Sequence, residues 1–151
     1  MYKLKTPQAP LALTTAGMIP FVAIVGIMWV ERNDIALLNT AGIWMIVYGA
    51  VILSFLGGVR WGVEMSRRDK PRFGELVLSI LGALIGWGLV LAFFRWGHPA
   101  VFPGMAAALL FYFGVDRMSG EMPIWYRKLR VWPTGVAVLS LIGAYLLLRG
   151  G

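Results

Sequence analysis

Residues 38–62, LNTAGIWMIVYGAVILSFLGGVRWG, form an uninterrupted run of 25 residues in which Arg60 is the only charged side chain. An α-helix needs about 20 apolar residues to cross the roughly 30 Å of hydrocarbon in a lipid bilayer. A helix also satisfies its own backbone hydrogen bonds, which a lipid-exposed loop cannot do. We therefore predict that this stretch spans a membrane.

Four further apolar blocks share this character, at residues 11–30, 76–96, 100–118 and 131–148. The whole chain of 151 residues is 59% apolar and 14% charged, with a mean hydropathy of +0.75. Soluble domains are about 45–50% apolar and about 25% charged. The sequence thus predicts an all-α integral membrane bundle of five transmembrane helices in a single domain, residues 1–151. Short turns make neighbouring helices antiparallel.

The basic residues predict the orientation, because lysine and arginine concentrate in cytoplasmic loops. Five spans place the N-terminus and the second and fourth loops on one side. Eleven basic residues fall on that side: Lys3, Lys5, Arg60, Arg67, Arg68, Lys70, Arg72, Arg117, Arg127, Lys128 and Arg130. Only Arg32, Arg95 and Arg149 fall on the other side. We expect a cytoplasmic N-terminus and an outer C-terminus.

The first residues, MYKLKTPQAP, resemble neither a cleavable signal nor an Arg- and Ser-rich transit peptide. A multi-pass protein of the bacterial inner membrane is the expectation. The net charge of +7 follows from the topology, so no nucleic-acid partner is expected.

The sequence lacks the residues that several kinds of chemistry require. The chain has no cysteine and one histidine, His98, so we expect no disulfide and no metal site. It contains no Walker loop, GxSxG or HExxH motif. We expect no catalytic residue, no cofactor and no enzymatic activity.

Three charged residues near the cytoplasmic ends of two spans form the candidate polar site. Glu64 lies one helical turn after Arg60, so the two share a face and are expected to pair. Asp116 lies at a similar depth in the antiparallel fourth span, and charges inside a span usually face a partner in the bundle. We predict an interhelical contact between Arg60 and Asp116, which acts either as a structural clasp or as an anion or headgroup site.

Small residues recur every four positions in the second span, at Ala50, Ser54, Gly58 and Gly62, and a GxxxG pair, Gly82 and Gly86, occurs in the third. Such stripes let helix backbones approach closely. They could instead open a cleft for a flat apolar ligand. The candidate packing or pocket residues are Ser54, Gly57, Gly58, Trp61, Gly62, Gly82, Gly86 and Trp87.

The stretch YGAVILSFLGGVRWG resembles the signature of the transmembrane-protein-69-like family, a bacterial domain of unknown function with the number 3429. AGMIPF, SILGALIGWGLVL and MPIWYRKLRVWPTG resemble its other conserved stretches, although Gly82 and Trp132-Pro133 depart from the common pattern. The resemblance implies a small multi-span membrane protein and assigns no activity. The matching residues are Tyr48, Ser54, Phe55, Gly57, Gly58, Arg60, Trp61, Gly62, Trp125, Tyr126, Leu129 and Arg130.

Three functions fit these observations. A non-catalytic accessory subunit or assembly factor of a larger membrane complex suits the small size and the helix-packing stripes. A binder or carrier of a lipid, quinone or tetrapyrrole suits an interhelical pocket beside the tryptophans. A lipid-modifying enzyme would have to use Arg60, Glu64 and Asp116. The expected partners are membrane lipids, with a larger complex, a homodimer or a small hydrophobic ligand as the alternatives.

Overall fold

The structure, a computed structural model, describes residues 6–150. Lys3 and Lys5, which contribute to the predicted orientation, lie outside this range. Residues 6–150 are helical throughout, apart from turns, and contain no strand. The helices are α1 (Gln8–Val30), α2 (Ile35–Arg67), α3 (Phe73–Trp96), α4 (Val101–Met118), α5 (Ile124–Leu129) and α6 (Val131–Arg149).

Local sequence signals set the ends of several helices. The Asp34 carboxylate accepts a hydrogen bond of 3.0 Å from the backbone N–H of Leu37 and so caps α2. Gly97 ends α3 with a φ of 61°, a left-handed conformation that glycine adopts without steric cost. Pro99 follows and prevents α3 from continuing, so the chain turns back into α4.

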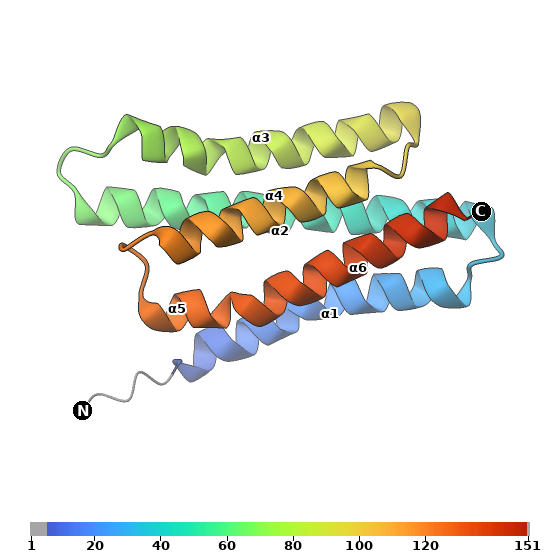
Figure 1. The fold of residues 1–151 in the computed structure, drawn as a ribbon, viewed down its shortest axis with the longest axis horizontal. Helices are drawn as coiled ribbons and strands as arrows, with labels where there is room; N and C mark the ends of the chain where they lie inside the picture. The colour runs from blue at the N-terminus through green and yellow to red at the C-terminus, as the bar shows by residue number, and fades with distance from the viewer. Residues whose placement is uncertain (1–5, 151) are drawn as a thin grey trace.

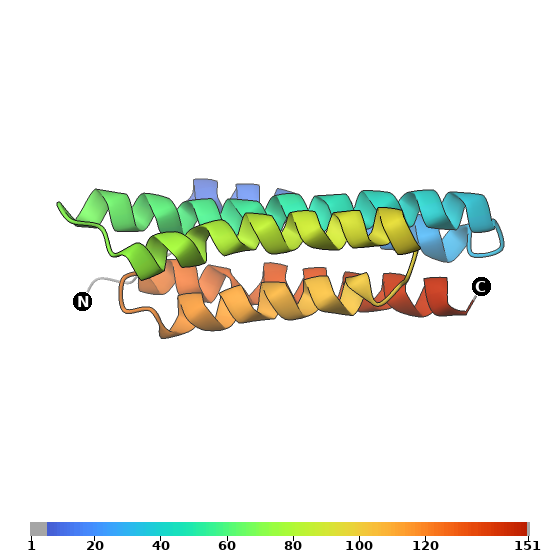
Figure 2. The same cartoon turned by 90° about the horizontal axis from the view of Figure 1, so that it is seen from above.

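The helices run up and down and form two layers (Figures 1 and 2). One layer contains α1, α2 and α3, and the other contains α4, α5 and α6. The central helix α2 packs against α1, α3, α4 and α6, and contact between α1 and α6 closes the bundle. The buried core lies along α2 and α4, and its largest fully buried side chains include Met45, Phe102, Met105 and Tyr112.

Five helical segments are long and apolar enough to cross a membrane, and the fifth of them combines α5 with α6. Two boundaries differ from the prediction. The 33 residues of α2 extend about 50 Å at 1.5 Å per residue, so this helix continues beyond the hydrocarbon. Residues 124–129, which lie before the predicted span 131–148, form α5 and continue the direction of α6 (Figure 1).

The tightest helix contact joins α2 to α3. A Cβ atom added at Gly57 would lie 2.0 Å from the carbonyl oxygen of Ser79, and one added at Gly82 would lie 2.9 Å from that of Leu53. Only glycine allows backbones to approach this closely. By contrast, Gly58 and Gly62 have nothing within 4 Å of an added Cβ, so they take no part in this contact.

A cavity with a polar end beside a buried ion-pair network

Charged residues from α2, α3, α4 and the connections between helices meet at the end of the bundle where α2 ends and α3 begins. Eight ion pairs connect four arginines with four carboxylates: Arg60, Arg68, Arg72 and Arg130 with Glu64, Glu75, Asp116 and Glu121. Because the numbers are equal, the network carries no formal net charge.

Asp116 is the most deeply buried member of the network and lies between two arginines. Its Oδ1 accepts a hydrogen bond of 3.0 Å from Arg60, and its Oδ2 lies 3.4 Å from Nη1 of Arg130. Asp116 is 1% exposed, and both arginines are 6% exposed. A buried charge is tolerated when it is partnered, and its partner becomes costly to remove. The predicted contact between Arg60 and Asp116 is therefore present, and Arg130 adds a second cation to it.

Glu64 does not pair with Arg60, contrary to the expectation from their spacing. Arg60 binds Asp116 and, at 2.5 Å, Glu75. The loop after α2 folds back, so Glu64 accepts hydrogen bonds from the backbone N–H of Arg72 at 2.7 Å and from its Nη2 at 3.0 Å. The hydrogen bond from the Arg72 side chain to Glu64 also raises the pKa of Arg72. Helical spacing alone does not determine which neighbour a charged residue pairs with, and here the loop that follows α2 provides a partner for Glu64.

Within residues 6–150, no pocket opens beside the three buried glycines of the candidate set. Gly57, Gly82 and Gly86 are buried, and the facing helix backbone fills the space beside them. The remaining candidates face outward from the bundle: Ser54, Gly58, Trp61, Gly62 and Trp87. Ser54 and Trp87 line only a shallow hollow with Val47, Ala50, Val51, Ala83 and Val90.

A cavity of about 200 Å³ lies elsewhere, between α1, α2, α4 and the α5–α6 segment. Its walls are almost entirely apolar. They consist of Leu13, Thr14, Gly17, Met18 and Phe21 from α1, Ile52, Phe55 and Leu56 from α2, Leu109 from α4, and Tyr126, Leu129, Arg130, Pro133, Thr134 and Ala137. Leu13 and Phe55 are 74% and 64% exposed, so the cavity opens between α1 and α2 toward the surface that faces lipid.

Two polar groups mark one end of the cavity. The Tyr126 hydroxyl is buried and has no hydrogen-bond partner among the described residues, and the buried Nη1 of Arg130 has only its 3.4 Å ion pair with Asp116. An unpaired buried polar group costs about 1–3 kcal/mol, so such groups usually serve a ligand, an ion or a water molecule. In the sequence, Tyr126 stands out only as part of the family-like motif, and Arg130 only there and as one of the basic residues of the cytoplasmic side. Their role was not visible because it depends on where α5 and α6 pack.

Residues 6–150 contain no group of three or more His, Asp or Glu side chains arranged to hold a metal ion. The features that distinguish this chain are thus five apolar spans, a charge-balanced network at one end and an apolar cavity beside it. These features define a multi-pass membrane protein.

Comparison with known proteins gives its family. The family model described as "Protein of unknown function (DUF3429)" matches residues 6–146. Transmembrane protein 69 of Xenopus tropicalis is 33% identical over 143 residues, which cover 91% of this chain and 54% of the relative. Transmembrane protein 69 of Mus musculus is 32% identical over 148 residues, covering 93% and 57%. The chain belongs to this family, and it spans just over half the length of these curated relatives. No solved structure matches it.

Proposed function

We propose that this protein is a non-catalytic binder of a small, uncharged amphiphile, which it holds in the cavity between α1, α2, α4 and α6. One observation carries the proposal: an apolar cavity that opens toward lipid is lined by Tyr126, whose buried hydroxyl has no hydrogen-bond partner among the described residues, and by Arg130, whose buried Nη1 has only an ion pair with Asp116. Ligand sites in membrane and soluble bundles combine apolar walls with a few polar groups in the same way.

The charge balance of the network indicates that the head of the ligand is uncharged. Four arginines already face four carboxylates, so an anionic head would add an unbalanced charge. Tyr126 and Arg130 supply hydrogen-bond donors, and a neutral carbonyl oxygen is the acceptor that fits them. A cavity of about 200 Å³ compares with the roughly 150 Å³ cavity that holds benzene. One quinone ring or one ester-bearing acyl segment therefore fits, whereas a tetrapyrrole is too large.

The location belongs to the same proposal. We place the protein in the bacterial inner membrane with its N-terminus in the cytoplasm. Five basic residues that take part in no ion pair within residues 6–150 support this orientation, because they lie on the side of the network: Arg67, Lys70, Arg117, Arg127 and Lys128. The opposite end has Arg32, Arg95 and Arg149. The bias matches the rule that cytoplasmic loops are basic.

The test compares two glycines of α1. A Cβ added at Gly17 would make only an ordinary contact of 3.9 Å with the Tyr48 hydroxyl, and Gly17 lines the cavity, so we expect a leucine side chain there to extend into the cavity. Gly26 has open space and lines no part of the cavity. We expect Gly17→Leu to lose the small molecule that wild type retains in native mass spectrometry, and Gly26→Leu to keep it.

A short-chain ubiquinone and a monoacyl ester, titrated separately into delipidated protein, distinguish the two ligand chemistries. Weaker binding of one of them by Gly17→Leu than by Gly26→Leu supports the cavity as its site. Equal binding of both probes by the two variants would contradict the proposal.

The accessory-subunit function stays a prediction that the same mass spectra test. A protein of the native membrane that co-purifies at fixed stoichiometry, with no small molecule retained, would favour that function over ligand binding.

A further inference from the structure

Three of the cations at the network end that lie outside the network are grouped together. Arg117, Arg127 and Lys128 take part in none of the eight ion pairs among the described residues. Together with Ile124 they line one hollow on the outer surface, where α4 ends and α5 begins. We call the hollow that these three cations line the basic hollow. A concentration of positive charge without a carboxylate attracts an anion from outside the chain.

The fold builds the basic hollow from two helix ends. Arg117 lies in the last turn of α4, and Nη1 of Arg127 donates a hydrogen bond of 3.2 Å to its carbonyl oxygen. That bond satisfies a carbonyl that the helix end would otherwise leave free. It also fixes α5 against α4, so the guanidinium of Arg127 and the ammonium of Lys128 stay next to Arg117.

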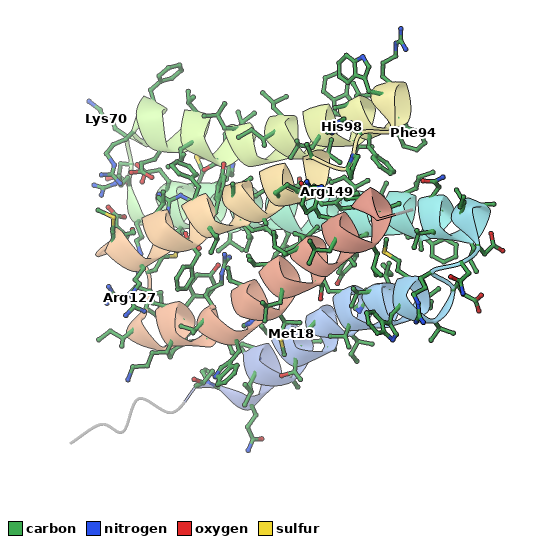
Figure 3. All side chains as sticks on the ribbon, turned by 45° about the vertical axis from the view of Figure 1, so that its right-hand side comes forward. Met18, Lys70, Phe94, His98, Arg127 and Arg149 are labelled. Carbon is green, nitrogen blue, oxygen red and sulfur yellow. The ribbon has the colours of Figure 1, made fainter. Side chains whose placement is uncertain are left out.

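The depth of the hollow indicates where its anion comes from. It lies at the end of the bundle that also contains Lys70 and Arg127, opposite the turn with His98 (Figure 3). The α4 span ends at Met118, only one residue after Arg117. Trp132, which is 78% exposed, lies about one helical turn after Lys128 in the sequence. Exposed tryptophans favour the membrane interface. The basic hollow is thus at the level of lipid headgroups.

We propose that the basic hollow binds the phosphodiester of an anionic phospholipid. Guanidinium groups donate two hydrogen bonds to phosphate oxygens, and lysine adds a point charge. Exposed Ile124 gives the adjoining acyl chain an apolar contact. This site is separate from the cavity, which Arg117, Ile124, Arg127 and Lys128 do not line.

The test uses two double variants of equal charge. Arg127→Gln/Lys128→Gln removes two cations of the hollow, and Arg67→Gln/Lys70→Gln removes two exposed cations of the same end that form no ion pair with any described residue. Each protein is placed in nanodiscs of phosphatidylcholine with a minor fraction of phosphatidylglycerol. Native mass spectrometry then counts the phosphatidylglycerol that remains bound.

We expect the hollow variant to retain about tenfold less phosphatidylglycerol than wild type, and the control to retain nearly as much as wild type. Arg117→Gln should also lose lipid, although it keeps the backbone carbonyl that Arg127 binds, so a loosened α5 does not explain the loss. Gly17→Leu should retain the lipid, which separates this site from the cavity.

Two results would overturn the proposal. Equal loss in both double variants would mean that the lipid responds only to general surface charge. Binding of inorganic phosphate to the hollow in detergent, without enrichment of phosphatidylglycerol in nanodiscs, would identify a soluble anion as the occupant.

Discussion

The burial of single residues distinguishes the charged side chains that stabilise this bundle from those that contribute little to its stability. Asp116 is buried between Arg60 and Arg130, whereas Glu121 lies at the rim, with its side chain 24% exposed beside Arg68 and Arg72. Removing one partner of a buried ion pair leaves an uncompensated charge and costs about 3–5 kcal/mol. An exposed pair contributes about 0–1 kcal/mol.

Asp116→Asn should therefore lower the unfolding temperature in detergent far more than Glu121→Gln, although each variant removes one negative charge. Circular dichroism at 222 nm during heating measures both. Adding Arg130→Gln to Asp116→Asn should recover part of the loss, because one unpaired cation is removed as well. Equal effects of the two single variants would mean that water reaches Asp116.

Two tyrosines allow a similar comparison for the cavity. The Tyr126 hydroxyl is buried at the polar end of the cavity and has no hydrogen-bond partner in the described part of the chain, whereas the Tyr145 hydroxyl accepts a hydrogen bond from Arg149 at the other end of the bundle. Tyr126→Phe should weaken binding of the retained ligand by about threefold to tenfold, the usual net value of one hydrogen bond. Tyr145→Phe should leave it unchanged. Equal affinities in titrations of the two variants would show that the ligand does not contact Tyr126.

Among the helices, α2 shows best how far a small-residue pattern predicts packing. The pattern predicts that small residues let helix backbones approach closely, and α2 does approach α3 closely at Gly57. Of the four-residue stripe itself only Ala50 contacts α3, beside Gly86, while Ser54, Gly58 and Gly62 face outward. Four-residue spacings on both sides look alike in one sequence. Only the position of α3 distinguishes them.

Adjacent glycines of α2 test this assignment. An added Cβ would collide with the Ser79 carbonyl at Gly57 but meets nothing at Gly58. Gly57→Ala should force α2 and α3 apart and cost at least about 1–3 kcal/mol of stability. Gly58→Ala should be neutral or slightly stabilising, since alanine favours helix. Thermal unfolding of the two variants measures the difference, and a stable Gly57→Ala protein would contradict the contact.

At the scale of the molecule, the need for apolar side chains in lipid makes the spans predictable from the sequence. The same need does not predict the cavity. Apolar blocks of sufficient length reveal the five spans, and their alternation places Arg60 at the depth of Asp116. The cavity depends instead on how α1 diverges from α2 toward its N-terminus (Figure 1). Arg130 reaches both the network and the cavity because α5 continues into α6. Hydropathy alone does not predict this arrangement of the two helices.

The orientation of the whole bundle is the remaining prediction, and the chain suits a direct test because it has no cysteine. Ser66 lies near the end of α2 beside the basic residues, and Asn33 lies in the turn between α1 and α2 at the opposite end; both are exposed. If the basic end is cytoplasmic, a membrane-impermeant maleimide should label Asn33→Cys in spheroplasts. It should label Ser66→Cys only in inverted membrane vesicles. The reverse pattern would place the network, the basic hollow and the N-terminus outside, and the bound phospholipid would then have to come from the outer leaflet.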